Sequence, residues 1–240
     1  MKILAIHNFH RKGSASGDDQ VFKSETALLE SHGNQVIKYT VSNDEFDNAG
    51  LIGKLSATFG MLWSSKNYRA VRQMIEKEKP DIVLVHGDTS TAFAASLAAF
   101  YQQIPVGHVE AGLRTYNMKS PYPEEFNRQA IGLTASLHFA PTQKAADALL
   151  KEGKDPEQIF VTGNTGIDAL HYTVRNDFYH PEIEWAKDSR LIAVTAHRRE
   201  NLGEPMRDMF RAIHRIVEEF TDVKVIYPVH LNPLVRKNRR

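Results

Sequence analysis

The chain contains no cysteine, so disulfide bonds and cysteine-based metal sites are excluded. It has no apolar run of membrane-spanning length, and the apolar start over residues 3–6 is too short for a signal peptide. An excess of one charge is also missing, because 30 Lys and Arg residues face 29 Asp and Glu residues. We therefore expect a cytoplasmic protein that has neither a nucleic-acid partner nor a membrane partner.

Short apolar runs alternate with helical patterns, which predicts an α/β fold with a doubly wound, Rossmann-type parallel sheet. We expect its strands over residues 2–7, 35–41, 81–86, 106–110, 137–140 and 159–162. A further β-α-β pattern over residues 190–229 is too short for a complete second sheet. The predicted domains are an N-terminal Rossmann-like domain (1–177), a linker (178–189) and a partial, truncated second Rossmann-like lobe (190–240).

Two segments of the first domain carry weaker patterns. The polar Gly/Ser loop over residues 8–19 lacks GxGxxG, and Asp18 and Asp19 would repel an anion, so an ordinary connection is favoured over a phosphate site. Residues 51–63 are apolar with two glycines, and we expect a helix or a loop that packs on the domain.

The clearest chemical pattern lies at the ends of two predicted strands. Asp88 follows one strand, and Glu110 ends the next. A right-handed crossover places both residues at the carboxyl edge of the sheet, where open α/β sheets bind ligands. Glu124 begins the following helix, and Arg128 lies one turn later. Carboxylates that converge in a cleft are suited to proton transfer at carbon.

Each of these residues also has a purely structural explanation. Asp88 could cap the helix that follows it, since Asp before a helix accepts bonds from free amide groups. Glu124 and Glu125 could simply favour the positive end of their helix. For any one of these residues the structural explanation is at least as good as the functional one. The four residues taken together favour a functional site.

Several collinear motifs carry a resemblance over about residues 79–233. They are HGDTSTAFAASLAAFYQQIPVGHVEAGLRT, SPYPEEFNRQ, LHFAPTQKAADALL, VTGNTGIDAL, TAHRRENLGEPMRDMFRAI and VIYPVHLNP. In these motifs the chain resembles the non-hydrolysing UDP-N-acetylglucosamine 2-epimerases. The resemblance implies a GT-B-like fold and inversion at C2 of a UDP-N-acetylhexosamine, by elimination and re-addition of UDP. It implies no cofactor, and the dispersed histidines indicate no metal site.

The resemblance also assigns roles to individual positions. Those matched to catalytic residues are Asp88, Glu110, Glu124 and His197. Those matched to substrate binding are Arg114, Arg128 and Arg198. A histidine bonded within a strand-end loop is the alternative for His197, and the two arginines after it favour anion binding. A homodimer is an assembly that the resemblance allows.

The N-terminal segment follows a different pattern. Residues 1–78 resemble retaining GT-B glycosyltransferases, and they lack the arginine motif with which the epimerases open. The nucleotide-gripping part of the epimerases' second lobe is also missing. Two alternatives therefore stay open: a GT-B glycosyltransferase that uses a nucleotide sugar, or an inactive chimeric or truncated α/β protein. If the chain is an epimerase, we expect its 240 residues to bind UDP-GlcNAc poorly and to turn it over little.

Overall fold

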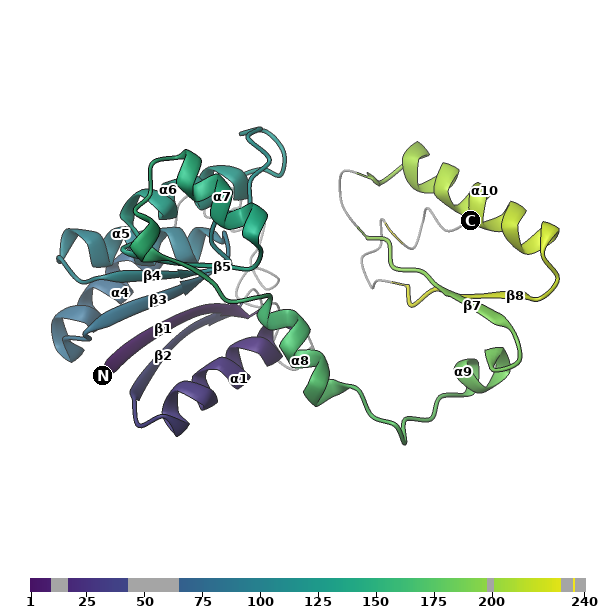
Figure 1. The fold of residues 1–240 in the computed structure, drawn as a ribbon, viewed down its shortest axis with the longest axis horizontal. Coiled ribbons are helices and arrows are strands. Elements are labelled where there is room, and N and C mark those ends of the chain that lie inside the picture. The colour runs from purple at the N-terminus through teal and green to yellow at the C-terminus, as the bar shows by residue number, and fades with distance from the viewer. Residues whose placement is uncertain (10–16, 43–64, 198–200, 230–234, 236–240) are drawn as a thin grey trace, which may run out of the picture. The chain divides into compact units, whose positions relative to one another are not determined.

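The computed structural model describes residues 1–9, 17–42, 65–197, 201–229 and 235 (Figure 1). It divides into two compact units, Met1–Thr173 and Val174–Arg240, and each is described by itself. Three predicted features lie outside the described residues. They are the segment over residues 51–63 that we expect to pack on the domain, the central part (10–16) of the predicted Gly/Ser loop, and Arg198. Among the described helices, none is long and apolar enough to cross a bilayer.

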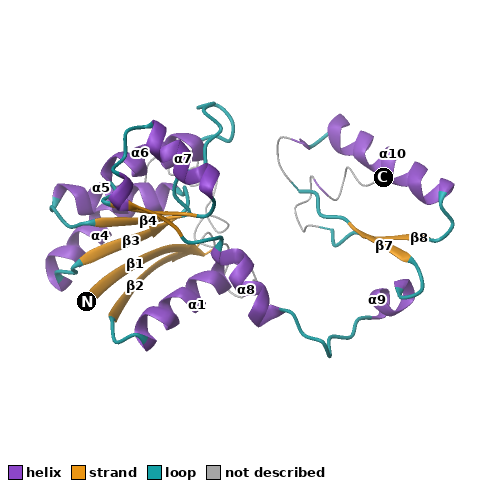
Figure 2. Cartoon of the chain, in the orientation of Figure 1, coloured by secondary structure: helices purple, strands orange, loops and turns teal. Residues whose placement is uncertain are grey.

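The first unit is built on a six-stranded parallel sheet with the order β2-β1-β3-β4-β5-β6 (Figure 2). Its strands are β1 (Lys2–Phe9), β2 (Gln35–Ser42), β3 (Ile82–His86), β4 (Val106–Val109), β5 (Leu137–Ala140) and β6 (Ile159–Val161). All six predicted strands are confirmed, as is their parallel pairing. The strand order reverses between β1 and β3, and ligands bind at such a switch point in open α/β sheets.

Helices cover both faces of this sheet (Figure 1). On one face α5 (Ser90–Tyr101) packs on β1, β3 and β4, between α4 (Ser65–Glu78) and α6 (Glu124–Thr134). On the same face, α7 (Gln143–Lys151) packs on β5 and β6. The short helix η1 (Pro156–Gln158) follows α7 in the chain and leads into β6. On the other face α1 (Gly17–Ser31) packs on β1 and β2 and contacts α8 (Thr165–Thr173).

Small side chains bring α5 close to the sheet. Its buried alanines are Ala92, Ala94, Ala95, Ala98 and Ala99, each at most 2% exposed. All of them except Ala94 share a core with Val83, Val85 and Val106 of the central strands. Thr89 caps the start of the helix, and its side chain accepts a hydrogen bond from the amide of Ala92 at 3.1 Å. This capping fixes the direction in which the chain leaves β3.

The second unit contains two parallel strands, β7 (Arg190–Ala193) and β8 (Val223–Ile226), with α10 (Glu204–Glu219) between them. The predicted linker is not wholly irregular, because α9 (Pro181–Ala186) forms within it. Proline is favoured in the first helical turn, and Glu182 and Glu184 lie near the positive end of the helix. The predicted bounds of the domains stay a prediction.

Candidate active site

The turn between β3 and α5 holds Asp88 against α6. Its carboxylate forms an ion pair with the Arg128 guanidinium, and Asn127 donates its Nδ2–H to the Asp88 carbonyl at 2.8 Å. Burial raises the pKa of Asp88, the charge of Arg128 opposes this rise, and the negative charge of Glu124 adds to it. α6 therefore brings a second carboxylate and a cation to Asp88, as the sequence predicts.

The capping explanation of Asp88 is wrong. The side chain that caps α5 is that of Thr89, one residue later in the chain. This leaves the Asp88 carboxylate directed to Arg128, with its side chain 20% exposed.

The two glutamates at the start of α6 have different surroundings. Glu125 is fully buried and accepts hydrogen bonds from the amides of Thr115 and Tyr116 and from Gln129, at 2.8 to 3.1 Å. It therefore anchors the loop before α6. Glu124 has a buried Oε2 atom for which no hydrogen-bond partner exists among the described residues. A carboxylate oxygen in this situation is available to a ligand.

Glu110 follows β4 in a strained backbone conformation. Its φ is 63°, in the left-handed region that residues other than glycine rarely adopt. Flanking backbone bonds hold it there: Gly87 donates to Val109, and Ala111 donates to Phe139, both at 3.0 Å. Such strain costs on the order of 1–3 kcal/mol and is concentrated at functional sites.

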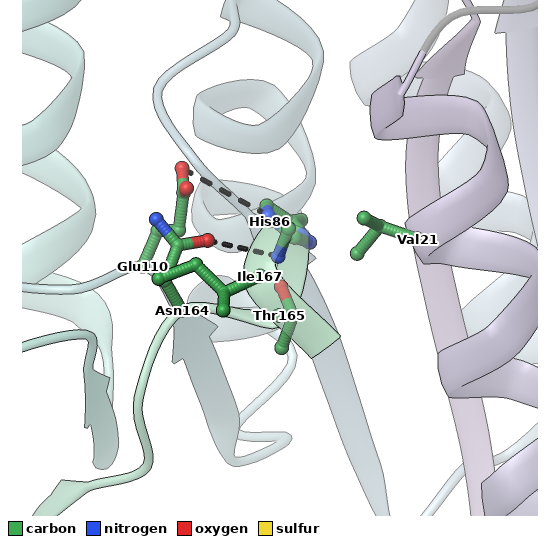
Figure 3. A pocket seen from close by; sticks show the side chains of 7 residues that line it. Val21, His86, Glu110, Asn164, Thr165 and Ile167 are labelled. Atoms are coloured by element: carbon green, nitrogen blue, oxygen red, sulfur yellow. Dashed lines mark hydrogen bonds and ion pairs between the residues drawn. The ribbon is translucent and has the colours of Figure 1, made fainter. Parts of the chain in front are cut away.

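A pocket of about 280 Å³ opens beside Glu110. Its lining includes His86 from the end of β3, Val21 from α1, and Asn164 and Thr165 at the start of α8. Figure 3 shows the side chains of His86 and Glu110 directed toward one another, and Nε2 of His86 is 3.8 Å from Oε2 of Glu110. The charge of His86 also acts on Asp88, so the pocket and the Asp88 group are neighbours.

The other predicted residues are Arg114, His197 and Arg198. The Arg114 side chain is 2% exposed and forms a double ion pair with Glu152, at 2.8 and 3.0 Å. His197 is exposed and follows β7 in the second unit. The roles predicted for Arg114, His197 and Arg198 stay predictions.

Comparison with known proteins gives a consistent assignment. A family model described as UDP-N-acetylglucosamine 2-epimerase matches residues 63–239. The chain belongs to this epimerase family. A UDP-N-acetylglucosamine 2-epimerase of Bacillus subtilis is 64% identical over 165 residues, which are 69% of this chain and 43% of that protein. The chain thus spans less than half of that epimerase's length.

Solved structures extend the similarity to the whole fold. An S. aureus protein solved with UDP has a TM-score of 0.83 at 41% identity, covering 99% of this chain and 64% of that one. The Neisseria meningitidis UDP-GlcNAc 2-epimerase, solved with UDP-GlcNAc, has a TM-score of 0.79 at 33% identity, covering 100% of this chain and 68% of that one. The predicted GT-B-like α/β fold is thereby confirmed.

Sequence reasoning missed the polar residues that α1 contributes beside the epimerase-like segment. Nδ1 of His86 lies 3.4 Å from Oε2 of Glu25, and His7 forms a buried pair with Asp19 at 3.2 Å. A signal was present in the helical spacing. Glu25 falls three and four residues after Phe22 and Val21, which face the sheet, so the buried stripe of α1 contains a carboxylate.

Proposed function

We propose that the chain carries the acid–base part of a UDP-N-acetylglucosamine 2-epimerase site, which interconverts UDP-GlcNAc and UDP-ManNAc by elimination and re-addition of UDP. The observation that carries this proposal is the grouping of Asp88, Glu110 and Glu124 at the carboxyl edge of the sheet. All three lie within the segment that matches the family model. The UDP-GlcNAc in the Neisseria structure supports the choice of substrate.

The reaction needs groups that remove and return a proton at C2 of the hexosamine. A carboxylate with a raised pKa is a stronger base, and burial gives Asp88 this property. Glu110 and Glu124 are the other candidates, because one borders the pocket and the other carries a buried oxygen without a partner among the described residues. Opposite faces of C2 need two such groups.

Cations are required where UDP departs. Arg128 brings a cation to the acidic group through its pair with Asp88. We assign the diphosphate to His197 and Arg198 of the second unit, and a further substrate contact to Arg114, by their match to the family. Guanidinium groups bind diphosphate oxygens through paired hydrogen bonds.

The test is incubation with UDP-GlcNAc in D2O, followed by NMR for deuterium at C2, UDP-ManNAc, free UDP and glycal. We expect exchange at C2 that the Glu110→Gln variant abolishes. The matched control is Glu76→Gln on α4, whose side chain is exposed and paired with Arg72. Exchange that persists in Glu110→Gln contradicts the assigned role.

A GT-B glycosyltransferase is the second candidate, because the family match begins only at residue 63. The same experiment separates the two functions. A transferase moves the sugar to an added acceptor and leaves C2 protonated, whereas an epimerase exchanges the C2 proton without an acceptor. The cytoplasmic location and the homodimer stay predictions from the resemblance.

A further inference from the structure

The imidazole of His86 lies between two carboxylates from different elements. Its Nδ1 atom is 3.4 Å from Oε2 of Glu25 on α1, and its Nε2 atom is 3.8 Å from Oε2 of Glu110 after β4. The three side chains are 17%, 25% and 33% exposed for His86, Glu25 and Glu110. At such partial burial, charges act on one another more strongly than they do in open water.

Other titratable groups lie near His86 on the packed elements, and one of them is His108 of β4, whose pKa the charge of His86 helps to lower. From β1, the ring of His7 lies 6.5 Å from that of His86 and is stacked on Phe22 of α1. Asp19, also on α1, pairs with His7, and Asp88 follows β3 two residues after His86. α1 thus supplies one carboxylate to each of the two histidines.

A carboxylate at one ring nitrogen decides what the other nitrogen does. When Nδ1 carries a proton close to a carboxylate, the negative charge favours the charged imidazolium. Nε2 then presents its own N–H to the second carboxylate. In this arrangement an N–H group orients Glu110, whose backbone is already held in the left-handed region.

We propose that Glu25 is a positioning residue that holds His86 protonated on both ring nitrogens, so that Nε2–H faces the Glu110 carboxylate. The inference rests on the proposed function only for the role of Glu110. α1 lies before residue 63, where the family match begins, so Glu25 comes from outside the epimerase-like segment. Residues from before and after position 63 therefore meet at one site.

The experiment is NMR of the ¹⁵N-histidine-labelled full chain over pH 5 to 9, with the His86 signals assigned by loss in His86→Gln. We expect both ring nitrogens to be protonated at pH 7 in the unaltered chain. Glu25→Gln should lower the His86 titration midpoint by about one pH unit, a tenfold loss of proton affinity, as removal of one nearby opposite charge does. The matched control is Glu30→Gln on the same helix, which loses an exposed pair with Lys38.

Two results would overturn the proposal: an Nδ1 atom without a proton at pH 7, or a Glu25→Gln midpoint equal to that of Glu30→Gln. Should Glu25→Gln fail to give a folded spectrum, Glu110→Gln provides the second variant, since loss of this carboxylate should also lower the midpoint. The spectra need no substrate, so a failure of the epimerase assay leaves them unchanged. Conversely, C2 exchange with an unshifted His86 would keep the proposed function and remove the role of Glu25.

Discussion

The two faces of the six-stranded sheet are packed to different standards. On the face covered by α4 to α7, every helix lies within the segment matched by the family model, and the alanines of α5 are buried against the central valines. On the other face α1 precedes that segment, and an apolar cavity of about 230 Å³ lies between α1 and the strands. The apolar cavity thus lies on the face that is covered by α1, which precedes the epimerase segment.

The cavity shows what α1 lacks. Its lining combines Leu29 and Phe22 of α1 with Leu84 and Phe139 of the sheet, and it reaches the surface beside Leu28, which is 60% exposed. Atoms that border a gap lose dispersion contacts on one side. Polar pairs, such as that between His7 and Asp19, help to hold α1 in place. We infer that the packing of α1, rather than the pairing of the strands, limits the stability of this half of the domain.

The largest expected effect is a loss of stability in acid, and it arises on the face of the sheet covered by α4 to α7. His108 and His138 lie side by side on β4 and β5, and both are buried. Burial lowers the pKa of His108 to about 3 and that of His138 to about 4, from an ordinary value of 6.5. Because the unfolded chain binds these protons more readily, stability is complete above about pH 6.5 and is lost as the pH falls toward 4 and 3.

The size of this effect is comparable to the stability of a whole domain. One pKa unit corresponds to about 1.4 kcal/mol, and domains are stable by roughly 5–15 kcal/mol. We expect acid unfolding, followed by circular dichroism, with a lower midpoint pH in His138→Leu. Exposed His32→Leu is the control and should leave the midpoint unchanged. Equal midpoints in all three proteins would show that the buried histidines do not drive unfolding.

The second comparison applies one substitution to both faces. Burial alone raises the pKa of Glu125, but the N–H groups of Thr115, Gln129 and Tyr116 outweigh it, and the pKa lies below its usual value. Glu125→Gln replaces one acceptor oxygen with an NH₂ group and leaves a donor unpaired. The expected cost is about 1–3 kcal/mol in urea unfolding.

The matched variant on the other face is Glu25→Gln. Its carboxylate is 25% exposed, and ion pairs near the surface contribute about 0–1 kcal/mol. We expect the free energy of unfolding to fall by about 1 kcal/mol, since a shift of about one pH unit in the titration of His86 corresponds to about 1.4 kcal/mol. A larger loss in Glu25→Gln than in Glu125→Gln would reverse the ranking of the two faces.

The sheet and the acidic edge could be predicted from sequence because they follow from short-range pattern and topology. Apolar runs locate the strands, and parallel pairing alone places Asp88 and Glu110 at one edge. The cap of α5 could not be decided in this way, since Asp88 and Thr89 are both good caps and the turn geometry chooses between them.

Contacts between residues far apart in the chain could not be predicted from the sequence pattern. Arg114 and Glu152 are 38 residues apart in the chain, so their pair depends on how α7 packs. The sequence did not predict α8, because Gly166 disfavours a helix in its first turn. In the structure, the Asn164 side chain accepts a hydrogen bond from the Gly166 amide at 2.8 Å, and the helix contacts α1. Tertiary contacts thus determine these features.

The smallest expected effect comes from filling the cavity beneath α1. Ala5 of β1 is 4% exposed and lines this cavity, so Ala5→Val adds apolar atoms where space exists. Each buried methylene contributes roughly 0.8 kcal/mol, and valine suits a strand, so a gain of about 1 kcal/mol is expected in thermal unfolding. The control is Ala140→Val in β5, a fully buried strand alanine in the core beside α7. Overpacking there should cost about 1–3 kcal/mol. If both variants lost stability equally, the two faces would be equally tight, and the contrast between them would fail.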